Sequence, residues 1–373
     1  MSSSQCESCI TQTEVLAVIL DLDGTLLDTE NATKYVLKEF LAKYEKDLDK
    51  ERESKKRFGM TLQVSAALIV KDYDLPLTPN QFIEEIMPMY RDKWLNARAL
   101  PGANRLIKHL YKNGLPFALA SNSLTEYIDA KISHQEGSRP FKFNGRLNIF
   151  IEAARRMGVD AAKCLVIEDS LVGVQAAKAA KMKVVVVPSQ SEGDCSLLAD
   201  SMLHSLLEFR PELWGLPPFD DWFDNALPIE PIYLSIQYKN GFVSNIRDVG
   251  KSALPCQVSG LFFGWAESGI HGTLKVLVHI GSDHCSCSPH RKIVSTSPSF
   301  SFISKQICII DKKADELPDQ QMQLVLVGYI RGMYSMEIGS IDVGILEEDK
   351  SIASSCLDQH HFAVPSSWQM LHI

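Results

Sequence analysis

The stretch VILDLDGTLLDTE, residues Val18–Glu30, decides the fold of this chain. An apolar run, Val15 to Leu20, ends in two aspartates one residue apart, Asp21 and Asp23, and a glycine and a threonine follow. The run is rich in β-branched residues and too short for a helix, so it predicts a fully buried strand. Burying unpaired carboxylates costs free energy, which leaves three explanations for this strand end: a metal ion, a phosphate-handling site or an accidental turn.

The bulk composition limits the classes of partner. The chain has 373 residues, which is about right for two domains, with 45% apolar and 23% charged residues. Its formal net charge of −8 argues against nucleic acid or an acidic membrane as the main partner. A small phosphorylated molecule bound in one local pocket remains compatible with that charge.

The N-terminus and the cysteines indicate the compartment. The opening MSSSQCESCITQTE has no apolar core of a secretory signal, and residues 1–13 are predicted to be a disordered tail. The sequence contains no run of 18 apolar residues, so we predict no membrane-spanning helix. Nine scattered cysteines form no disulfide pattern and are typical of reduced thiols, so we expect a cytoplasmic protein.

The first two thirds of the chain alternate between strand and helix patterns after a helical insertion. Residues 31–98 show helical apolar spacing in several segments. Beyond them, helices are predicted at 104–112, 147–157 and 174–181, between the strand-like runs LPFALASNS, CLVIEDS and KVVVVPS. This alternation predicts an α/β domain over residues 14–210 with a doubly wound parallel sheet.

The remainder of the chain has a different texture. Residues 211–229 are rich in proline, tryptophan and acids, and we interpret them as a linker. The short runs GLFFGWA, TLKVLVHIG, FSFISKQICII and MQLVLVGYI then alternate with turn residues, and one helix is expected near the end. Residues 230–373 are therefore predicted to form a small β-barrel domain.

Three strand ends of the predicted sheet carry polar residues. They are Asp21 and Asp23, Ser121 and Asn122, and Glu168 and Asp169. Ligands bind at the carboxyl edge of doubly wound sheets, and such oxygen ligands suit Mg²⁺ together with a phosphate. A carboxylate can attack phosphorus to form an aspartyl-phosphate, while a second carboxylate protonates the leaving oxygen.

The motif DLDGTL at residues 21–26, placed after a buried strand, resembles the first motif of the haloacid dehalogenase phosphatase superfamily. The resemblance implies that Asp21 is the nucleophile and Asp23 the general acid/base. It implies phosphoryl binding by Thr25, Ser121 and Asn122. It also implies an Mg²⁺ site formed by Asp21, Asp23 through its carbonyl, Glu168 and Asp169. Residues 31–98 match the position of the family's helical cap.

The chain departs from that family at one charged position. The family has a lysine before the helix that here begins near IFIEAARR, and Asn144 stands in its place. Lys142 and Arg146 are the nearby cations that could replace its charge. Removing such a charge from a phosphoryl site costs on the order of 10²–10³ in rate.

From about residue 14 to its end, the chain resembles the plant family that joins an FMN hydrolase to a riboflavin kinase. WGLPPFDDWFDNALPIEPIY, SGLFFGWA and LVLVGYIR carry this likeness. It implies FMN as the phosphatase substrate, with riboflavin as product and ATP as substrate of the second domain. The kinase half lacks the family's P-T-A-N motif, and Val294 or Ser295 stands where a catalytic glutamate is expected, so we predict an inactive kinase.

Three alternatives stay open at this stage. In the first, the kinase is active and other residues compensate for its departures from the family pattern. In the second, the protein binds flavin or acts as a scaffold, with little turnover. In the third, the phosphatase acts on sugar or glycerol phosphates.

Overall fold

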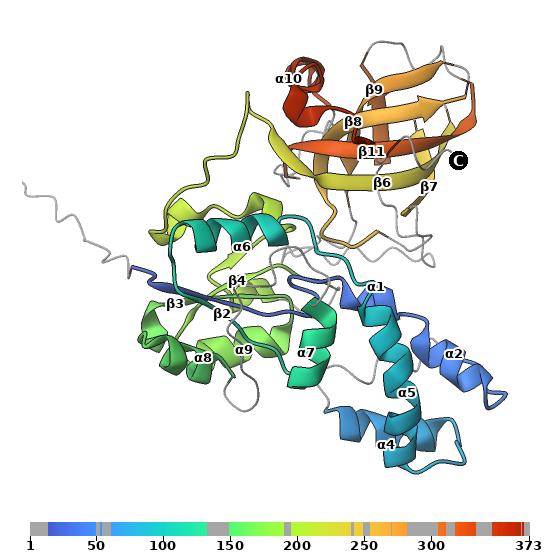
Figure 1. The fold of residues 1–373 in the computed structure, drawn as a ribbon, viewed down its shortest axis with the longest axis vertical. Helices are drawn as coiled ribbons and strands as arrows, with labels where there is room; N and C mark the ends of the chain where they lie inside the picture. The colour runs from blue at the N-terminus through green and yellow to red at the C-terminus, as the bar shows by residue number, and fades with distance from the viewer. Residues whose placement is uncertain are drawn as a thin grey trace, which may run out of the picture.

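The structure is a computed structural model, and it describes residues 14–49, 53, 61–132, 149–189, 195–239, 242–248, 254–269, 271–281, 305–310, 318–332, 345–366 and 368. It contains a parallel sheet covered by helices and a closed antiparallel barrel (Figure 1). The predicted fold class, a doubly wound α/β core followed by a small barrel, is confirmed.

The sheet has five strands, all parallel. They are β1 (Ala17–Leu20), β2 (Phe117–Leu119), β3 (Cys164–Glu168), β4 (Lys183–Val186) and β5 (Ser201–Met202). The order is β2-β1-β3-β4-β5, so β1 lies between β2 and β3. Because parallel strands share one carboxyl edge, the residues that follow β1, β2 and β3 meet on the same side of the molecule.

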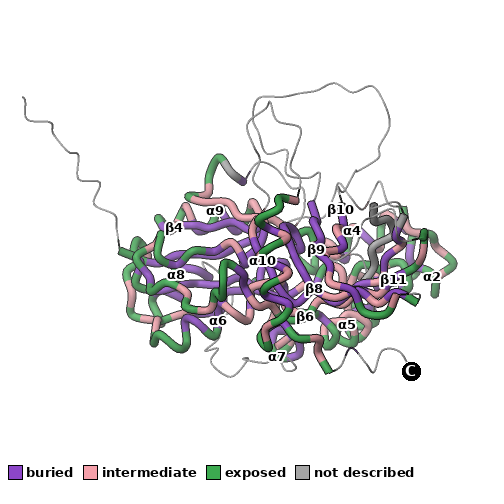
Figure 2. The backbone as a smooth tube through the Cα atoms, turned by 90° about the horizontal axis from the view of Figure 1, so that it is seen from above, coloured by how far each residue is buried: buried purple, intermediate pink, exposed green. Residues whose placement is uncertain are grey.

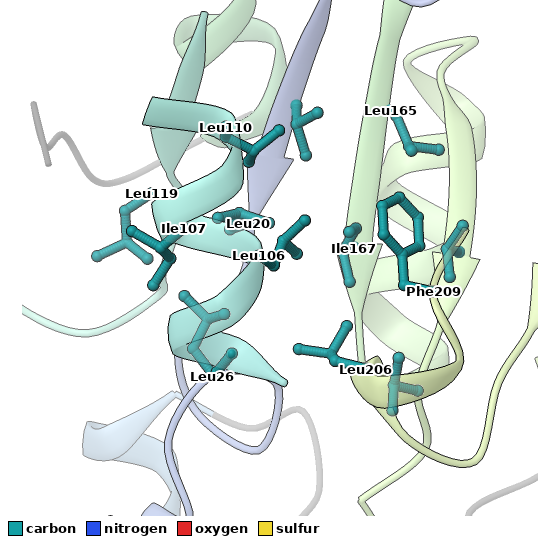
Figure 3. Packing of buried hydrophobic residues seen from close by; sticks show 14 of the residues in the cluster. Leu20, Leu26, Leu106, Ile107, Leu110, Leu119, Leu165, Ile167, Leu206 and Phe209 are labelled. Carbon is teal, nitrogen blue, oxygen red and sulfur yellow. The ribbon is translucent and has the colours of Figure 1, made fainter. Parts of the chain in front are cut away.

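Two hydrophobic cores cover the two faces of this sheet. Helix α6 (Ala103–Lys112) packs on one face, and α8 (Ile149–Met157) and α9 (Leu171–Ala179) pack on the other. Figure 3 shows Leu106 and Leu110 of α6 beside Leu20. Each such buried leucine contributes about 1.5–3 kcal/mol to folding. The strand predicted at the start of the chain is therefore buried from both sides, as its unbroken apolar run requires.

The two ends of the cap insertion lie next to each other where they join the core. Its helices are α1 (Thr29–Thr33), α2 (Val36–Ala42), α4 (Leu62–Asp72) and α5 (Pro79–Trp94). They have a core of their own, in which the rings of Phe40 and Phe82 meet edge to face at 5.0 Å. A β-bridge between Leu27 and Ala99 joins the two ends of the insertion. Helix α7 (Thr125–Ile132) follows β2 and lies beside the end of α5.

The barrel contains six strands in the order β10-β7-β6-β11-β8-β9. They are β6 (Leu227–Lys239), β7 (Phe242–Asp248), β8 (Gly260–Ser268), β9 (Gly272–Ile280), β10 (Lys305–Ile309) and β11 (Gln320–Arg331). Helix α10 (Glu347–Leu357) packs against it. Short 3₁₀ turns lie at Ala161–Lys163, Cys195–Leu197, Leu206–Glu208, Pro211–Trp214 and His360–Phe362.

Two of these barrel strands were not expected from the sequence. Strand β6 begins at Leu227, before the end of the expected linker, and β7 lies ahead of the first strand-like run, GLFFGWA, that the sequence indicated. Pro228 and Pro231 weaken the strand signal of β6, because a proline cannot donate to a β-ladder. Pairing with β11 and β7 overrides that local preference.

The segment between sheet and barrel lies along α6. The Arg105 guanidinium donates to both oxygens of Asp221 at 2.7 Å and stacks over the Phe219 ring at 3.5 Å. The His109 ring nitrogen Nε2 lies 2.8 Å from the Pro217 carbonyl oxygen. The strands appear largely in purple between more exposed helices (Figure 2). In the part of the chain that the structure describes, no helix combines the length and the apolar character needed to cross a bilayer.

Candidate active site

Three carboxylates meet at the carboxyl edge of the sheet. Leu20 of β1 lies opposite Ile167 of β3, so the residues that follow them, Asp21 and Glu168, are neighbours. Asp169 completes the group, in which one carboxylate oxygen of each residue lies within 4.8 Å of the others. All three side chains are buried, with 5–9% of their surface exposed. The strand ends that the sequence singled out therefore converge in space.

Burial and mutual repulsion make this cluster costly when it is ionised. Burial, followed by the charges of Glu168, Asp169 and Asp23, raises the pKa of Asp21 well above its usual value. Burial and then Glu168 raise the pKa of Asp169 in the same way. Burial also raises the pKa of Glu168, although hydrogen bonds from Ser170 oppose the effect. A cation between the three groups would remove both penalties.

Two buried oxygens at the site have no hydrogen-bond partner among the described residues. They are Oδ2 of Asp21 and the hydroxyl Oγ1 of Thr25. Buried polar atoms in native proteins are nearly always paired, so an oxygen without a protein partner indicates a position for a ligand. A divalent cation that takes oxygen ligands fits the Asp21, Glu168 and Asp169 group, and a phosphoryl group fits beside Thr25.

Hydrogen bonds hold the remaining carboxylate oxygens in place. Glu168 Oε2 accepts from the backbone N–H groups of Asp169 and Ser170 at 2.6 Å each, at the start of α9. Asp169 Oδ2 accepts from the hydroxyl of Ser189, which follows β4. These bonds come from the start of α9 and from the segment after β4, and they fix the positions of the ligand atoms.

Two glycines leave the space that the carboxylates of Asp169 and Glu168 occupy. Gly24 has φ +84°, and a Cβ at this position would overlap the Asp169 carboxylate. Gly173 lies in the first turn of α9, where a Cβ would overlap the Glu168 carboxylate. The glycines that follow the two acidic motifs are therefore a packing requirement of the site.

Asp23 has different neighbours from the other acids. Its carboxylate accepts from Lys131 Nζ at 2.7 and 2.8 Å and from the Ser123 hydroxyl at 3.0 Å. The Ser121 hydroxyl lies 3.4 Å from the same carboxylate, at the limit of a hydrogen bond. The Asp23 carboxylate is outside the close acidic group of Asp21, Glu168 and Asp169.

Lys131 was missed by the sequence analysis. It lies on α7 and is 3% exposed, although lysines rarely lose contact with solvent. Its signal is helical spacing: Lys131 follows the fully buried Ile128 by three residues and so shares its inward face. The sequence instead indicated Lys142 and Arg146, the cations on either side of Asn144.

The structure places some of the predicted residues and leaves others unplaced. Thr25 and Ser121 are buried at the site, at 1% exposure each, whereas Asn122 is exposed. Residues 133–148 lie outside the described part of the chain, and with them Asn144 and its candidate substitutes. Val294 and Ser295 are outside it as well.

A segment of the barrel also reaches this edge of the sheet. The side-chain amide of Gln257, which is 3% exposed, donates to the Gly24 carbonyl at 3.1 Å. The Cys256 thiol donates to the Ser189 carbonyl at 3.2 Å. Gly24 and Ser189 both contact Asp169, so the barrel touches two of the loops that shape the acidic cluster.

Comparison with known proteins gives three findings. A family model of the haloacid dehalogenase-like hydrolases matches residues 15–181. A bifunctional riboflavin kinase/FMN phosphatase of Arabidopsis thaliana is 35% identical over 371 residues, covering 93% of this chain and 94% of that protein. (DL)-glycerol-3-phosphatase 2 of the same plant is 36% identical over 226 residues, covering 55% of this chain and 92% of the relative.

Among solved structures, a haloacid dehalogenase family hydrolase from Deinococcus radiodurans is similar, with 24% identity and a TM-score of 0.46. The match covers 56% of this chain and 100% of that one.

Proposed function

Since the chain belongs to the haloacid dehalogenase-like hydrolases and is a phosphomonoesterase, we propose that it hydrolyses FMN to riboflavin and phosphate, with Mg²⁺, through an aspartyl-phosphate. The observation that carries the mechanism is the buried group of Asp21, Glu168 and Asp169, with one oxygen of Asp21 left without a protein partner. A nucleophile beside a cation site is the arrangement that this chemistry needs.

Asp21, Glu168 and Asp169 would hold the cation. When bound, Mg²⁺ would neutralise charge on the phosphoryl oxygens and on the three carboxylates. The cluster supports a requirement for a cation: without one, burial and repulsion favour protonated acids, and a protonated Asp21 is a poor nucleophile.

The remaining steps belong to side chains of this chain. Asp21 attacks phosphorus, and the bond from phosphorus to the ester oxygen breaks. Asp23, which Lys131 and Ser123 hold in place, gives the proton of its carboxylic acid form to the departing oxygen. The resulting carboxylate then takes a proton from the water that cleaves the aspartyl-phosphate. Thr25 and Ser121 offer buried hydroxyls to the phosphoryl oxygens.

FMN is favoured as substrate because the full-length relative carries both domains. The Arabidopsis FMN phosphatase aligns with the barrel as well as with the sheet, whereas the glycerol-3-phosphatase aligns with 55% of this chain. Glycerol 3-phosphate is the second candidate, since that relative matches the phosphatase part at a similar identity.

For the barrel, we propose that it has no riboflavin kinase activity. Support comes from the sequence, which lacks P-T-A-N and has no acidic residue between Asp283 and Asp311 to act as a base. Phosphorylation of riboflavin by ATP in the presence of the full chain would overturn this part of the proposal.

Phosphate release from FMN and from glycerol 3-phosphate, with Mg²⁺ or with a chelator, tests the phosphatase. We expect Mg²⁺-dependent release, a higher kcat/KM for FMN, and a loss of at least about 10³-fold in Asp21→Asn. The matched control is Asp129→Asn, an exposed aspartate on α7, which should keep full activity. A preference for glycerol 3-phosphate would replace FMN by the second candidate. No release from either compound would contradict the catalytic proposal.

A further inference from the structure

The environment of Lys131 is unusual for a lysine in a soluble protein. Its side chain is 3% exposed, and three hydrogen bonds leave the ammonium group, two to Asp23 and one of 2.9 Å to the Ser123 hydroxyl. Taking an ammonium group out of water costs several kcal/mol unless its bonds are satisfied. We therefore expect the Lys131 ammonium group to stay bonded to Asp23.

The cap closes the remaining side of this ammonium group. Lys131 Nζ lies 4.4 Å from the centre of the Trp94 ring, at the end of α5, and that ring packs against Tyr127 of α7 at 5.3 Å. A cation over a tryptophan ring is attracted by the negative face of the ring. The position of Lys131 is thus set by the cap and by α7, two elements independent of the β1 loop that carries Asp23.

Asp23 in turn depends on this cation for its direction. Ser123 is the other donor within 3.0 Å of its carboxylate, and the Ser123 hydroxyl itself bonds to Lys131. Both Asp23 oxygens face Lys131, so the ion pair is bidentate and fixes the rotation of the carboxylate. Among the described residues, no other cation makes a hydrogen bond to Asp23.

We propose that Lys131 is a positioning residue for catalysis, which fixes the place of the Asp23 carboxyl group for proton transfer and couples that place to the cap through Trp94. The proposal rests on the proposed phosphatase function and assigns Lys131 no contact with substrate. A misplacement of about 1 Å in a reacting group lowers the rate on the order of 10²-fold, so losing a bond that positions Asp23 should lower the rate of catalysis.

The test is a double-mutant cycle in the full chain with Mg²⁺, using FMN and p-nitrophenyl phosphate as substrates. The variants are Lys131→Met, Asp23→Asn and the double variant. If Lys131 acts through Asp23, Lys131→Met loses about 10–10²-fold in kcat with FMN. The double variant is then no slower than Asp23→Asn by more than about threefold, because the two residues act as one unit.

The second substrate adds a readout that a purely structural role would not change. p-Nitrophenolate leaves easily, so loss of an acid/base group affects the two substrates unequally, and the ratio of their rates changes. We expect Lys131→Met to shift that ratio in the same direction as Asp23→Asn. Multiplicative losses in the double variant, or a shift of the ratio in the opposite direction, would overturn the proposal.

Two further variants separate positioning from folding. Lys178→Met removes a lysine that also binds both oxygens of an aspartate, Asp200, but outside the site, and it should keep wild-type activity. Ser123→Ala removes the other donor to Asp23 without removing a buried charge, and it should show the same change in substrate ratio at smaller amplitude. A Ser123→Ala variant with an unchanged ratio would contradict the proposal even where Lys131→Met fails to fold. If the wild type releases phosphate from neither compound, the proposed function fails with it, whereas an active wild type with additive losses overturns only the role of Lys131.

Discussion

Asp21 lies in an environment that opposes its own ionised form. The residue is buried, two carboxylates stand beside it, and one of its oxygens has no protein partner among the described residues. Sites of this kind trade folding stability for reactivity, because the free energy is recovered only when ligands bind. The same property makes the residue testable by stability as well as by activity.

We predict that Asp21→Asn stabilises the metal-free protein at neutral and alkaline pH. Burial raises the pKa of Asp21 above its value in the unfolded chain, so its favourable contribution exists at low pH and is lost as pH rises through the folded-state pKa. Asparagine cannot ionise and avoids this loss. Thermal unfolding with a chelator should show a gain of about 2–6 °C at pH 8 and a smaller one at pH 5.

Excess Mg²⁺ provides the internal check for this prediction. Binding to the native state stabilises the wild type in proportion to ln(1 + [L]/Kd), and the variant has lost one ligand. The gain of Asp21→Asn should therefore shrink or reverse with Mg²⁺. A variant less stable than the wild type at pH 8 in chelator would mean that the carboxylate is not destabilising there.

At the scale of elements, the first turn of α9 is shaped by the carboxylate that it binds. Ser170 caps this helix through the Gly173 N–H at 3.1 Å, and Glu168 accepts from the backbone N–H groups of Asp169 and Ser170. The positive end of the helix dipole favours such an anion. Gly173 leaves the space that the Glu168 side chain fills.

Gly173→Ala should consequently reverse the usual effect of this substitution. In an unobstructed helix, alanine gains about 1 kcal/mol over glycine. Here the new methyl group displaces Glu168, and we expect a loss of about 1–3 kcal/mol in unfolding free energy together with weaker Mg²⁺ activation. The control is Gly269→Ala in the barrel, where an added Cβ meets nothing within 4 Å. A stabilised, fully active Gly173→Ala variant would refute the packing argument.

Helix α6 makes a second prediction at this scale, through the linker that lies along it. Arg105 is 12% exposed in its side chain, bonds Asp221 twice and stacks on Phe219, so Arg105→Ala should lower the unfolding midpoint by several degrees. Arg155 also binds a carboxylate twice, that of Glu152, but is 69% exposed. Arg155→Ala should change the midpoint by less than about 1 °C, because exposed ion pairs contribute little. Equal effects of the two variants would contradict the role given to the linker.

At the scale of the whole molecule, the barrel contacts two loops of the acidic site. Gln257 and Cys256 reach the loops after β1 and β4, and the Gln257 amide is buried against the Gly24 carbonyl. Through this contact the barrel supports the loop that carries the proposed nucleophile.

Gln257→Ala should lower the kcat/KM of the phosphatase by about tenfold, because the loss of a buried hydrogen bond costs about 1–3 kcal/mol and loosens the Gly24 loop. Steady-state rates with FMN and Mg²⁺ measure the effect. Gln321→Ala is the matched control, since Gln321 belongs to the same barrel but bonds Ser235 far from the sheet edge. Activity within about twofold of the wild type in Gln257→Ala would show that the two domains work independently.

The sequence alone determined the features that depend on local pattern. The buried strand before Asp21, the strand and helix alternation and the acidic strand ends follow from hydrophobic periodicity, because a parallel sheet covered on both faces permits little else. That Asp21, Glu168 and Asp169 meet followed as well, since parallel strands end at one edge.

Only the tertiary structure decided which partners these groups have. Lys131 and Gln257 lie 108 and 233 residues from the atoms that they contact, and no local pattern relates residues that are so far apart in the chain. Strand β6 was hidden by its prolines and is formed by pairing with β11. Local preferences select the elements, but long-range packing chooses their neighbours, and at this site the neighbours set the chemistry.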